Sequence, residues 1–327
     1  MALGEFGLIA KYFKRPATRA VLGVGDDCAL LAPTPSTHLA ISSDMLVQGR
    51  HFFADVDPRT LGHKALAVNL SDLAASGATP RAFTLALALP SVDEPWLQAF
   101  SQGMFALADL HGCELVGGDT TQGPLNICIT VFGEVTAGQA LLRSGAQAGD
   151  DIYVSGSLGD ARLALEALLG RISLPPEALA SARQRLECPT PRVALGTALR
   201  GIASSALDVS DGLLGDLGHI LEASQVGAEV DAAATMQLIA ASALWSRAST
   251  GFDQRLLAQC TLAGGDDYEL CFTAPASARN AVQTAAASAQ TPVHRIGRIT
   301  AQAGLRVLDA QGQPIDQAAL QSFDHFA

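Results

Sequence analysis

The sequence has few lysines, few aromatic residues and no long hydrophobic run. Only three of its 21 basic residues are lysines, and the 18 arginines are dispersed along the chain. Without a basic face, the protein is not expected to bind nucleic acid or an anionic membrane surface. No apolar stretch approaches the roughly 20 residues that cross a bilayer, and the N-terminal residues lack the pattern of a secretory signal. We therefore expect neither nucleic acid nor a membrane as a partner.

The six cysteines lack the spacing of a zinc site or a disulfide framework. They are scattered and form no CxxC pair, which argues against structural zinc. Four of them lie in apolar sequence contexts: Cys28, Cys113, Cys128 and Cys271. This usage predicts reduced, buried thiols and a cytoplasmic protein.

The common phosphate-binding loops are also missing. The chain has no GxxxxGK[ST] loop and no HRD or DFG set of a protein kinase. A glycine-rich stretch, "VSGSLGDA" at residues 154–161, runs from an expected strand into an expected helix. Its helix N-terminus could hold phosphate, or its glycines could simply form a tight turn.

What the sequence does have is aspartate. The net charge is −11, and 22 of the 32 acidic residues are Asp. An ionised carboxylate taken out of water costs several kcal/mol unless a partner compensates it. Six segments nevertheless place Asp among apolar or small residues: "GVGDDCALL" (23–31), "ISSDML" (41–46), "NLSDLAASGA" (69–78), "GGDTTQGP" (117–124), "DVSDGLLGDLGH" (208–219) and "GGDDYELCF" (264–272).

Magnesium is the partner that best fits these acids. A glycosidase needs only two carboxyls and usually has aromatic sugar platforms, whereas this chain has at least six such acids and few aromatic residues. Mg²⁺ takes oxygen ligands, typically one or two carboxylates for each ion together with substrate phosphates. The ions also reverse the sign of an acidic site that would otherwise repel ATP. The pattern therefore predicts several Mg²⁺ ions shared with a polyphosphate.

Strand and helix patterns alternate along the chain and predict an α/β or α+β protein of two domains, 1–142 and 143–327. The boundary is marked by the polar, glycine-rich "RSGAQAGDDIYVSG". Helices are predicted at residues 58–78, 94–111, 159–169, 191–200, 213–223 and 276–287. Strands are predicted at residues 37–45, 81–89, 114–116, 126–135, 151–155, 205–209, 268–272, 293–299 and 305–308.

Taken in order, the acidic segments resemble the thiamine-monophosphate kinase family. The resemblance is carried by residues 23–31, 42–44, 64–80, 117–124, 143–145, 208–219 and 264–272, and by "FDHF" near the C-terminus. The family belongs to a superfamily with aminoimidazole ribonucleotide synthetase and selenophosphate synthetase. The resemblance implies an N-terminal α/β domain that binds ATP and Mg²⁺ and forms a homodimer, with a C-terminal α/β domain. It implies the reaction ATP + thiamine monophosphate → ADP + thiamine diphosphate, a step of thiamine diphosphate biosynthesis.

The resemblance also implies the site residues. The metal ligands would be Asp27, Ser42, Ser43, Asp44, Asp72, Asp119, Asp208 and Asp211. The ATP contacts would be Gly118, Asp119, Arg143 and Ser210, and the substrate contacts would be His51, Asp266 and Phe323. Two positions depart from the family, since Asp266 stands where Glu is usual and Phe323 lacks the polar edge of Trp or Tyr.

Several of these residues have simpler explanations. Asp72 could lie on an exposed helix face, Asp211 could only cap the next helix, and His51 could be a surface histidine. Asp216 and His219 are interpreted as helix-surface or packing residues, and Asp26 as a turn residue.

The predicted mechanism is direct, in-line transfer of the γ-phosphoryl group. A phosphate monoester has a second pKa of about 6, so the acceptor is already largely deprotonated at neutral pH. No catalytic base is then expected, and Mg²⁺ and Arg143 would stabilise the transfer. Two alternatives stay open at this stage: an ATP-dependent synthetase or ligase of the same superfamily, and a non-catalytic nucleotide-binding protein.

Overall fold

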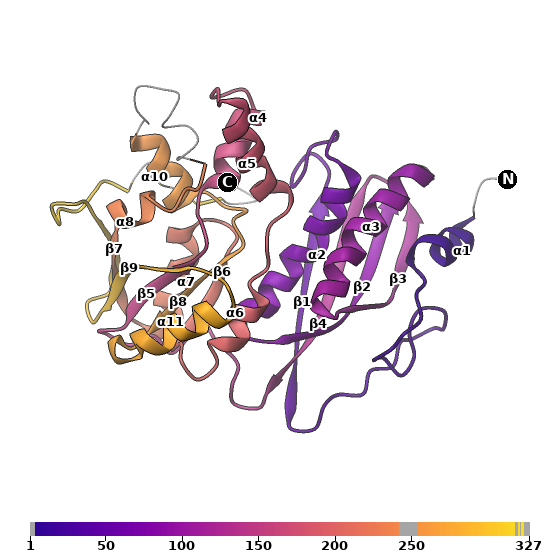
Figure 1. Ribbon diagram of the computed structural model, residues 1–327, viewed down its shortest axis with the longest axis horizontal. Helices are drawn as coiled ribbons and strands as arrows, with labels where there is room; N and C mark the ends of the chain where they lie inside the picture. Colours follow the sequence, from indigo (N-terminus) through magenta and orange to yellow (C-terminus); the bar gives the residue numbers. More distant parts are fainter. Residues whose placement is uncertain (1–3, 242–253, 318–319, 321, 324–327) are drawn as a thin grey trace. The chain divides into compact units, whose positions relative to one another are not determined.

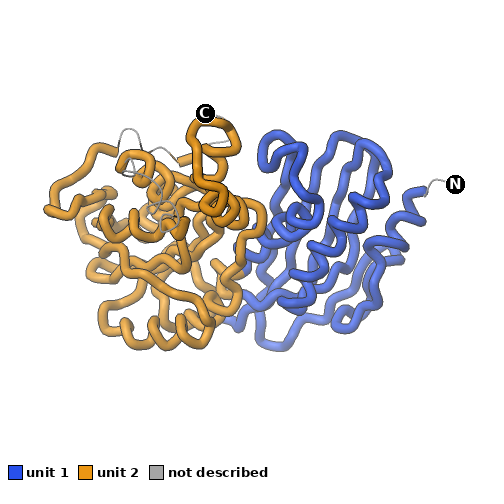
Figure 2. Tube along the Cα trace, turned by 45° about the horizontal axis from the view of Figure 1, so that its top comes forward, with its two compact units in different colours: residues 1–73, 78–138 blue, residues 74–77, 139–327 orange. Residues whose placement is uncertain are grey.

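The computed structural model describes residues 4–241, 254–317, 320 and 322–323 (Figure 1). The chain forms two compact units (Figure 2). Unit 1 comprises Met1–Leu73 and Ala78–Gly138, and unit 2 comprises Ala74–Gly77 and Gln139–Ala327. The domain boundary predicted from the sequence, between residues 142 and 143, falls within unit 2.

Unit 1 is a four-stranded sheet with helices on one face. The strands are β1 (Thr37–Val47), β2 (Thr79–Leu89), β3 (Glu114–Gln122) and β4 (Asn126–Thr136), in the spatial order β1-β4-β2-β3. The strands β2 and β3 pair in parallel, whereas β1–β4 and β2–β4 are antiparallel. The helices α2 (Pro58–Ala75) and α3 (Glu94–His111) lie against the sheet (Figure 1).

The two helices of this layer are defined by different sequence features. From Leu61 onward α2 is buried nearly all round, as expected of a helix whose apolar residues do not form a single stripe. In α3, Asp93 caps the N-terminus by accepting a hydrogen bond from Trp96 N at 3.1 Å. Gly112, in the left-handed conformation, ends this helix. A short N-terminal helix, α1 (Glu5–Leu8), continues as one π-helical turn, η1 (Ile9–Phe13).

The strand predicted at residues 114–116 is longer than its sequence pattern indicated. It continues to Gln122, because a bulge at Val116 lets it stay paired with β2. Gly118 and Asp119 are therefore strand residues on the edge of the sheet.

The face of the sheet opposite the helices is partly open at β1. Successive side chains of a strand point to opposite faces, and those of Ser42, Asp44 and Leu46 share the less exposed face. Ile41 and Met45 lie on the other face and are 59% and 52% exposed. Unit 1 therefore presents apolar side chains on an edge strand.

Unit 2 is built on a six-stranded mixed sheet. Its strands are β5 (Asp151–Ser155), β6 (Ser205–Val209), β7 (Gly227–Asp231), β8 (Glu269–Ala274), β9 (Val293–Thr300) and β10 (Gly304–Leu308), in the spatial order β10-β7-β9-β5-β8-β6. Its helices are α4 (Asp160–Leu168), α5 (Pro176–Glu187), α6 (Val193–Ala198), α7 (Leu213–Ser224), α8 (Ala232–Met236), α10 (Gln254–Ala263) and α11 (Arg279–Ser288), with a 3₁₀ turn, η2 (Ala276–Ala278).

The core of unit 2 lies between α7 and one face of this sheet. The helix contributes Leu213, Leu217 and Ile220, which pack with strand residues such as Val154 and Val209. Within the described residues, no helix is long and apolar enough to cross a membrane.

Three elements, β7, α5 and α10, were not predicted from the sequence. The buried face of α5 consists of Ala178, Ala182 and Leu186, a weak apolar signal in a polar segment. The strand β7 has only five residues, among them Gly227 and Glu229. Short or polar elements of this kind are formed by tertiary packing more than by their own hydrophobic period.

All six cysteines are free thiols. Cys113 and Cys271 are buried as predicted, and burial raises the pKa of Cys113 to about 12. The prediction of burial is wrong for Cys28, which is exposed, and for Cys128, which is partly exposed. The reason for Cys28 is that residues 21–30 form an open loop with isolated bridges and not a buried strand.

Candidate active site

In unit 1, the structure brings Ser42, Asp44 and Asp72 together between β1 and α2. The Ser42 hydroxyl donates a hydrogen bond to the Asp72 carboxylate. Asn69, one helical turn before Asp72, accepts from the Asp44 backbone N–H at 3.0 Å and donates to Ala65 O at 3.0 Å. Asp72 is only partly exposed, so the interpretation of it as an exposed helix residue is wrong.

Ser43 points to the other face of the sheet. Its hydroxyl donates to Ile129 O at 3.1 Å and lies 2.9 Å from Thr130 Oγ1. The side chain of Ser43 is therefore not brought together with those of Ser42 and Asp44, because adjacent residues of a strand face opposite ways.

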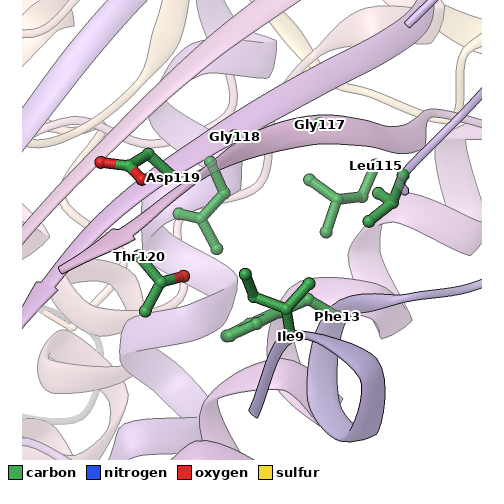
Figure 3. Close-up of a pocket in the computed structure, with 9 residues that line it drawn as sticks. Ile9, Phe13, Leu115, Gly117, Gly118, Asp119 and Thr120 are labelled. Atoms are coloured by element: carbon green, nitrogen blue, oxygen red, sulfur yellow. The ribbon is translucent and has the colours of Figure 1, made fainter. Parts of the chain in front are cut away.

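Gly118 and Asp119 form an exposed part of β3 beside an apolar pocket. Gly118 has φ +143°, and a Cβ there would lie 1.9 Å from Leu85 O, so only glycine allows this approach of the two strands. The pocket is lined by Ile9, Phe13, Val24, Leu85, Leu115 and residues 117–120. Figure 3 shows Asp119 at its edge, with the carboxylate directed away from Phe13.

Asp27 and His51 lie on loops of unit 1. Asp26 and Asp27 are both exposed, so the expectation of carboxylates taken out of water does not hold for this pair. The Asp27 N–H donates to Asp26 Oδ1 at 2.9 Å, as expected of a turn. His51 Nδ1 accepts from Val47 N at 2.9 Å, which places the ring proton on Nε2 and makes that nitrogen a donor.

In unit 2, the segment "DVSDG" runs from the end of β6 into α7. Asp208 belongs to the strand, Ser210 and Asp211 follow it, and Gly212 directly precedes the helix. Gly212 has φ +123°, and a Cβ there would lie 2.7 Å from Ala263. We call residues 210–212 the DG turn.

One buried carboxylate holds the DG turn. Asp216 Oδ2 accepts hydrogen bonds from the backbone N–H groups of Ser210, Asp211 and Gly212, at 3.1, 3.1 and 3.0 Å. Burial raises the pKa of Asp216 to about 7, and the charge of Asp211 adds to this, while the three N–H donors act in the opposite direction. The N-cap position of α7 is Gly212, which offers no side-chain cap.

The DG turn also holds two predicted substrate residues. The Asp266 N–H donates to Ser210 O at 2.8 Å, and the Phe323 N–H donates to Asp211 O at 3.0 Å. Asp266 has φ +66°, a conformation costly for a residue other than glycine. Phe323 is 44% exposed; the other residues of "FDHF" lie outside the described residues. The structure therefore brings Ser210, Asp211, Asp266 and Phe323 together.

Arg143 is not brought together with Ser210. Its carbonyl accepts from Ser224 Oγ at 3.2 Å, at the C-terminal end of α7, whereas the DG turn lies at the N-terminal end. A helix rises about 1.5 Å per residue, so the two ends are separated by roughly 17 Å over the length of α7. The Arg143 side chain is exposed.

The stretch at residues 154–161 favours the tight-turn interpretation over a phosphate site. The Gly159 N–H, at the start of α4, donates to Asp267 Oδ2 at 2.8 Å. An N–H that a phosphate would need is therefore already used by a carboxylate of the same unit.

The candidate metal-ligand atoms in both units suit a hard cation. They are carboxylate and hydroxyl oxygens, the ligands that Mg²⁺ prefers. Among the described residues, no three His, Cys, Asp or Glu side chains gather into a group able to hold a metal ion by themselves. Mg²⁺ needs no such cage when phosphate oxygens and water complete its coordination, so the residues fit Mg²⁺ held together with a nucleotide.

Two polar residues of these arrangements were not recognised as site residues in the sequence. Asn69 stands three positions before Asp72, which places both on one face of a helix. Asp216 stands four positions after Gly212, in the first turn of the predicted helix. Spacing alone marks them as polar helix residues; only the folded chain shows which backbone groups they bond.

The fold is that of the AIR synthase related proteins. The family model of their N-terminal domain matches residues 25–135, and that of their C-terminal domain matches residues 147–310. A thiamine-monophosphate kinase of Salmonella typhimurium is 48% identical to this chain over 332 aligned residues, 100% of this chain and 99% of its own length.

Solved structures agree with this relationship. The thiamine-monophosphate kinase of Stenotrophomonas maltophilia is 47% identical with a TM-score of 0.82, covering 94% of this chain and 95% of its own. AaThiL complexed with AMPPCP and TMP is 27% identical with a TM-score of 0.76, covering 90% and 89%. The chain belongs to the thiamine-monophosphate kinase family.

Proposed function

We propose that the protein phosphorylates thiamine monophosphate with ATP to give thiamine diphosphate and ADP, a step of thiamine diphosphate biosynthesis. One observation carries the proposal in the structure. The DG turn contains Ser210, the proposed nucleotide contact, and its backbone carbonyls accept from the N–H groups of Asp266 and Phe323, the proposed acceptor contacts. The full-length similarity to thiamine-monophosphate kinases, and the AaThiL complex with AMPPCP and TMP, support this assignment.

The chain's own residues would bind and orient the two substrates. In unit 1, Ser42, Asp44, Asp72 and Asp119, with Asp27 on its loop, are the candidate metal ligands. In unit 2 these are Asp208 and Asp211. When bound, Mg²⁺ would offset the repulsion between these acids and the phosphates.

Binding of the acceptor would use two kinds of group. Phe323 offers a ring face on which a thiazolium cation can stack, and the His51 Nε2–H can donate to a phosphate oxygen. Asp266 is one methylene shorter than the usual Glu, so we expect its contact with the pyrimidine to be longer or mediated by water. No catalytic base is needed, because the acceptor phosphate is already ionised.

We further propose that the protein is a homodimer that uses the open face of the unit 1 sheet. The apolar side chains of Ile41 and Met45 are more than half exposed on β1, and β1 is an edge strand. Such exposed apolar strands favour an interface with another chain. A cytoplasmic location stays a prediction.

The reaction can be tested directly by a ³¹P NMR time course with ATP, Mg²⁺ and thiamine monophosphate. We expect thiamine diphosphate and ADP to appear without free phosphate, and EDTA to stop their formation. Release of free phosphate would instead favour the synthetase or ligase alternative. An unchanged spectrum, together with tight nucleotide binding by calorimetry, would favour a binding protein.

Charge removal tests the metal assignment within the same assay. Asp44→Asn and Asp119→Asn keep the shape of the side chain but remove its charge. We expect each to lower turnover by about 10²-fold or more while leaving the far-UV circular dichroism spectrum unchanged. Wild-type turnover in both variants would contradict the assignment.

A further inference from the structure

Asp216 makes an unusual set of contacts for a helix residue. Its Oδ2 alone accepts three consecutive backbone N–H groups, those of Ser210, Asp211 and Gly212. The side chain is 6% exposed. A capping-box residue reaches back to one N–H that precedes the helix, whereas Asp216 gathers three, so its oxygen fixes the orientation of the whole DG turn.

The carbonyl side of the same turn is also engaged. Ser210 O accepts from Asp266 N, and Asp211 O accepts from Phe323 N. The N–H groups of the turn therefore bond to Asp216, and two of its carbonyls bond to the segments that carry the predicted acceptor residues. Any rotation of a peptide in the turn would move both sets of contacts.

The surroundings leave the turn little room to find another arrangement. Gly212 is held at φ +123° against Ala263, and a Cβ at Gly265 would lie 2.3 Å from Ser210 O. Packing of this kind restricts the backbone but does not supply hydrogen-bond acceptors. Without the Asp216 oxygen, the three N–H groups would have to rotate toward other partners.

We propose that Asp216 is a positioning residue for nucleotide and Mg²⁺ binding, which sets the direction of Ser210 and Asp211 without touching the substrate. The proposal rests on the proposed function for the roles of Ser210 and Asp211. Asp216, the second acid of "DGLLGD", lies outside the set of candidate ligands. The proposal assigns it a role in orienting Ser210 and Asp211.

The test compares Asp216→Ala with Asp160→Ala. Asp160 is a matched control, since it is 1% exposed, lies in the first turn of α4 and accepts from the backbone N–H groups of Ala240 and Ala241 at 3.0 and 2.8 Å. Both variants lose a buried acceptor of backbone N–H groups, and both are expected to lower the melting temperature. Of the two acceptors, Asp216 bonds to the DG turn, whereas Asp160 bonds to Ala240 and Ala241.

Binding of AMPPCP is measured by calorimetry as a function of Mg²⁺ concentration. We expect Asp216→Ala to raise the Mg²⁺ concentration for half-maximal binding about 10- to 100-fold, and Asp160→Ala to leave it within about twofold of the wild type. Hydrogen exchange of the amides of residues 210–212 should accelerate in Asp216→Ala alone. Equal Mg²⁺ dependence in Asp216→Ala and the wild type would overturn the proposal, as would the same shift in Asp160→Ala.

A conservative variant keeps the test decisive if Asp216→Ala does not fold. Asp216→Asn retains an oxygen that accepts the three N–H groups, but as a neutral and weaker acceptor. Its Mg²⁺ half-saturation should lie severalfold above the wild type, and Asp160→Asn should not change it. Equal values for Asp216→Asn and the wild type would refute the positioning role. Because binding is measured without turnover, the result does not depend on whether thiamine monophosphate is the acceptor.

Discussion

The position of Asp119 on the sheet edge depends on Gly118, the residue before it. The strand β3 approaches β2 so closely at Gly118 that a Cβ would lie 1.9 Å from Leu85 O, and the backbone there has φ +143°. Neither a backbone carbonyl nor this φ can adapt cheaply to a side chain. The position of a candidate ligand on the sheet edge is therefore set by the absence of a side chain at its neighbour.

Gly118→Ala should consequently destabilise the protein by about 3 kcal/mol or more, measured as the free energy of unfolding in urea. Gly117→Ala is the matched control. Its added Cβ would meet only Thr84 Cγ2 at 3.8 Å, an ordinary contact, and should cost less than about 1 kcal/mol. Similar losses in the two variants would show that the close approach at Gly118 is not a constraint.

At the scale of elements, the start of β8 is anchored by a buried ion cluster. Glu269 is fully buried and lies 2.7 Å from an Arg185 guanidinium nitrogen and 2.6 Å from Arg192 Nε. It also accepts from Ser155 Oγ at 2.5 Å. The cluster therefore joins α5 and the segment before α6 to β8, the strand that begins shortly after Asp266.

Glu269→Gln removes the charge that compensates two arginines and should destabilise the protein by about 3 to 5 kcal/mol. The ion pair between Arg183 and Glu187 within α5 serves as the control, because the arginine is 40% exposed. Glu187→Gln should change the free energy of unfolding by no more than about 0.5 kcal/mol. An equally small effect at Glu269 would contradict the anchoring role of the cluster.

A second ion cluster predicts a dependence on pH. The Arg279 guanidinium, which donates to the buried Asp151 carboxylate on β5 at 2.6 Å, lowers its pKa below the ordinary value of 3.8, and Arg295 adds to this. A carboxyl whose pKa is lowered by folding stabilises the protein above its unfolded pKa and loses that contribution as the pH falls through its folded pKa.

Asp151→Asn should therefore cost about 1 kcal/mol at pH 6, a modest amount because Arg279 is 52% exposed. The difference in free energy of unfolding between this variant and the wild type should shrink as the pH falls below about 4. Urea unfolding at a series of pH values measures it. A difference that stays constant down to pH 2 would show that Asp151 is not ionised through these contacts.

The elements that the sequence predicted are those with a strong local signal. The helix α3 has an apolar stripe, an Asp N-cap and a glycine stop, and its predicted bounds are correct. The predicted strand at residues 114–116 ended before β3 does. The bulge and the conformation of Gly118 are set by pairing with β2, which is distant in the sequence. The candidate ligands could be found from motifs, since each lies in a short segment. Asp216 could not be assigned its contacts, because they depend on where the backbone turns.

At the scale of the molecule, the net negative charge and the acidic candidate site both favour a requirement for metal ions. The chain carries a net charge of −11, and both units present carboxylates where polyanionic substrates are proposed to bind. Without cations, ATP would be repelled by this charge. The acids are therefore compatible with the proposed substrates only if metal ions lie between them.

The exposed apolar side chains on the open sheet face at β1 predict that the protein is a dimer in solution. Light scattering coupled to size exclusion should give twice the chain mass of 33.7 kDa, because an exposed apolar edge strand is covered when two copies associate. Ile41→Asp places a charge on that face and should give the monomer mass. Leu110→Asp is the control, since Leu110 is 76% exposed but lies on α3, in the helix layer. A dimer that survives Ile41→Asp but not Leu110→Asp would place the interface on the helices, and a wild-type monomer would exclude a stable dimer altogether.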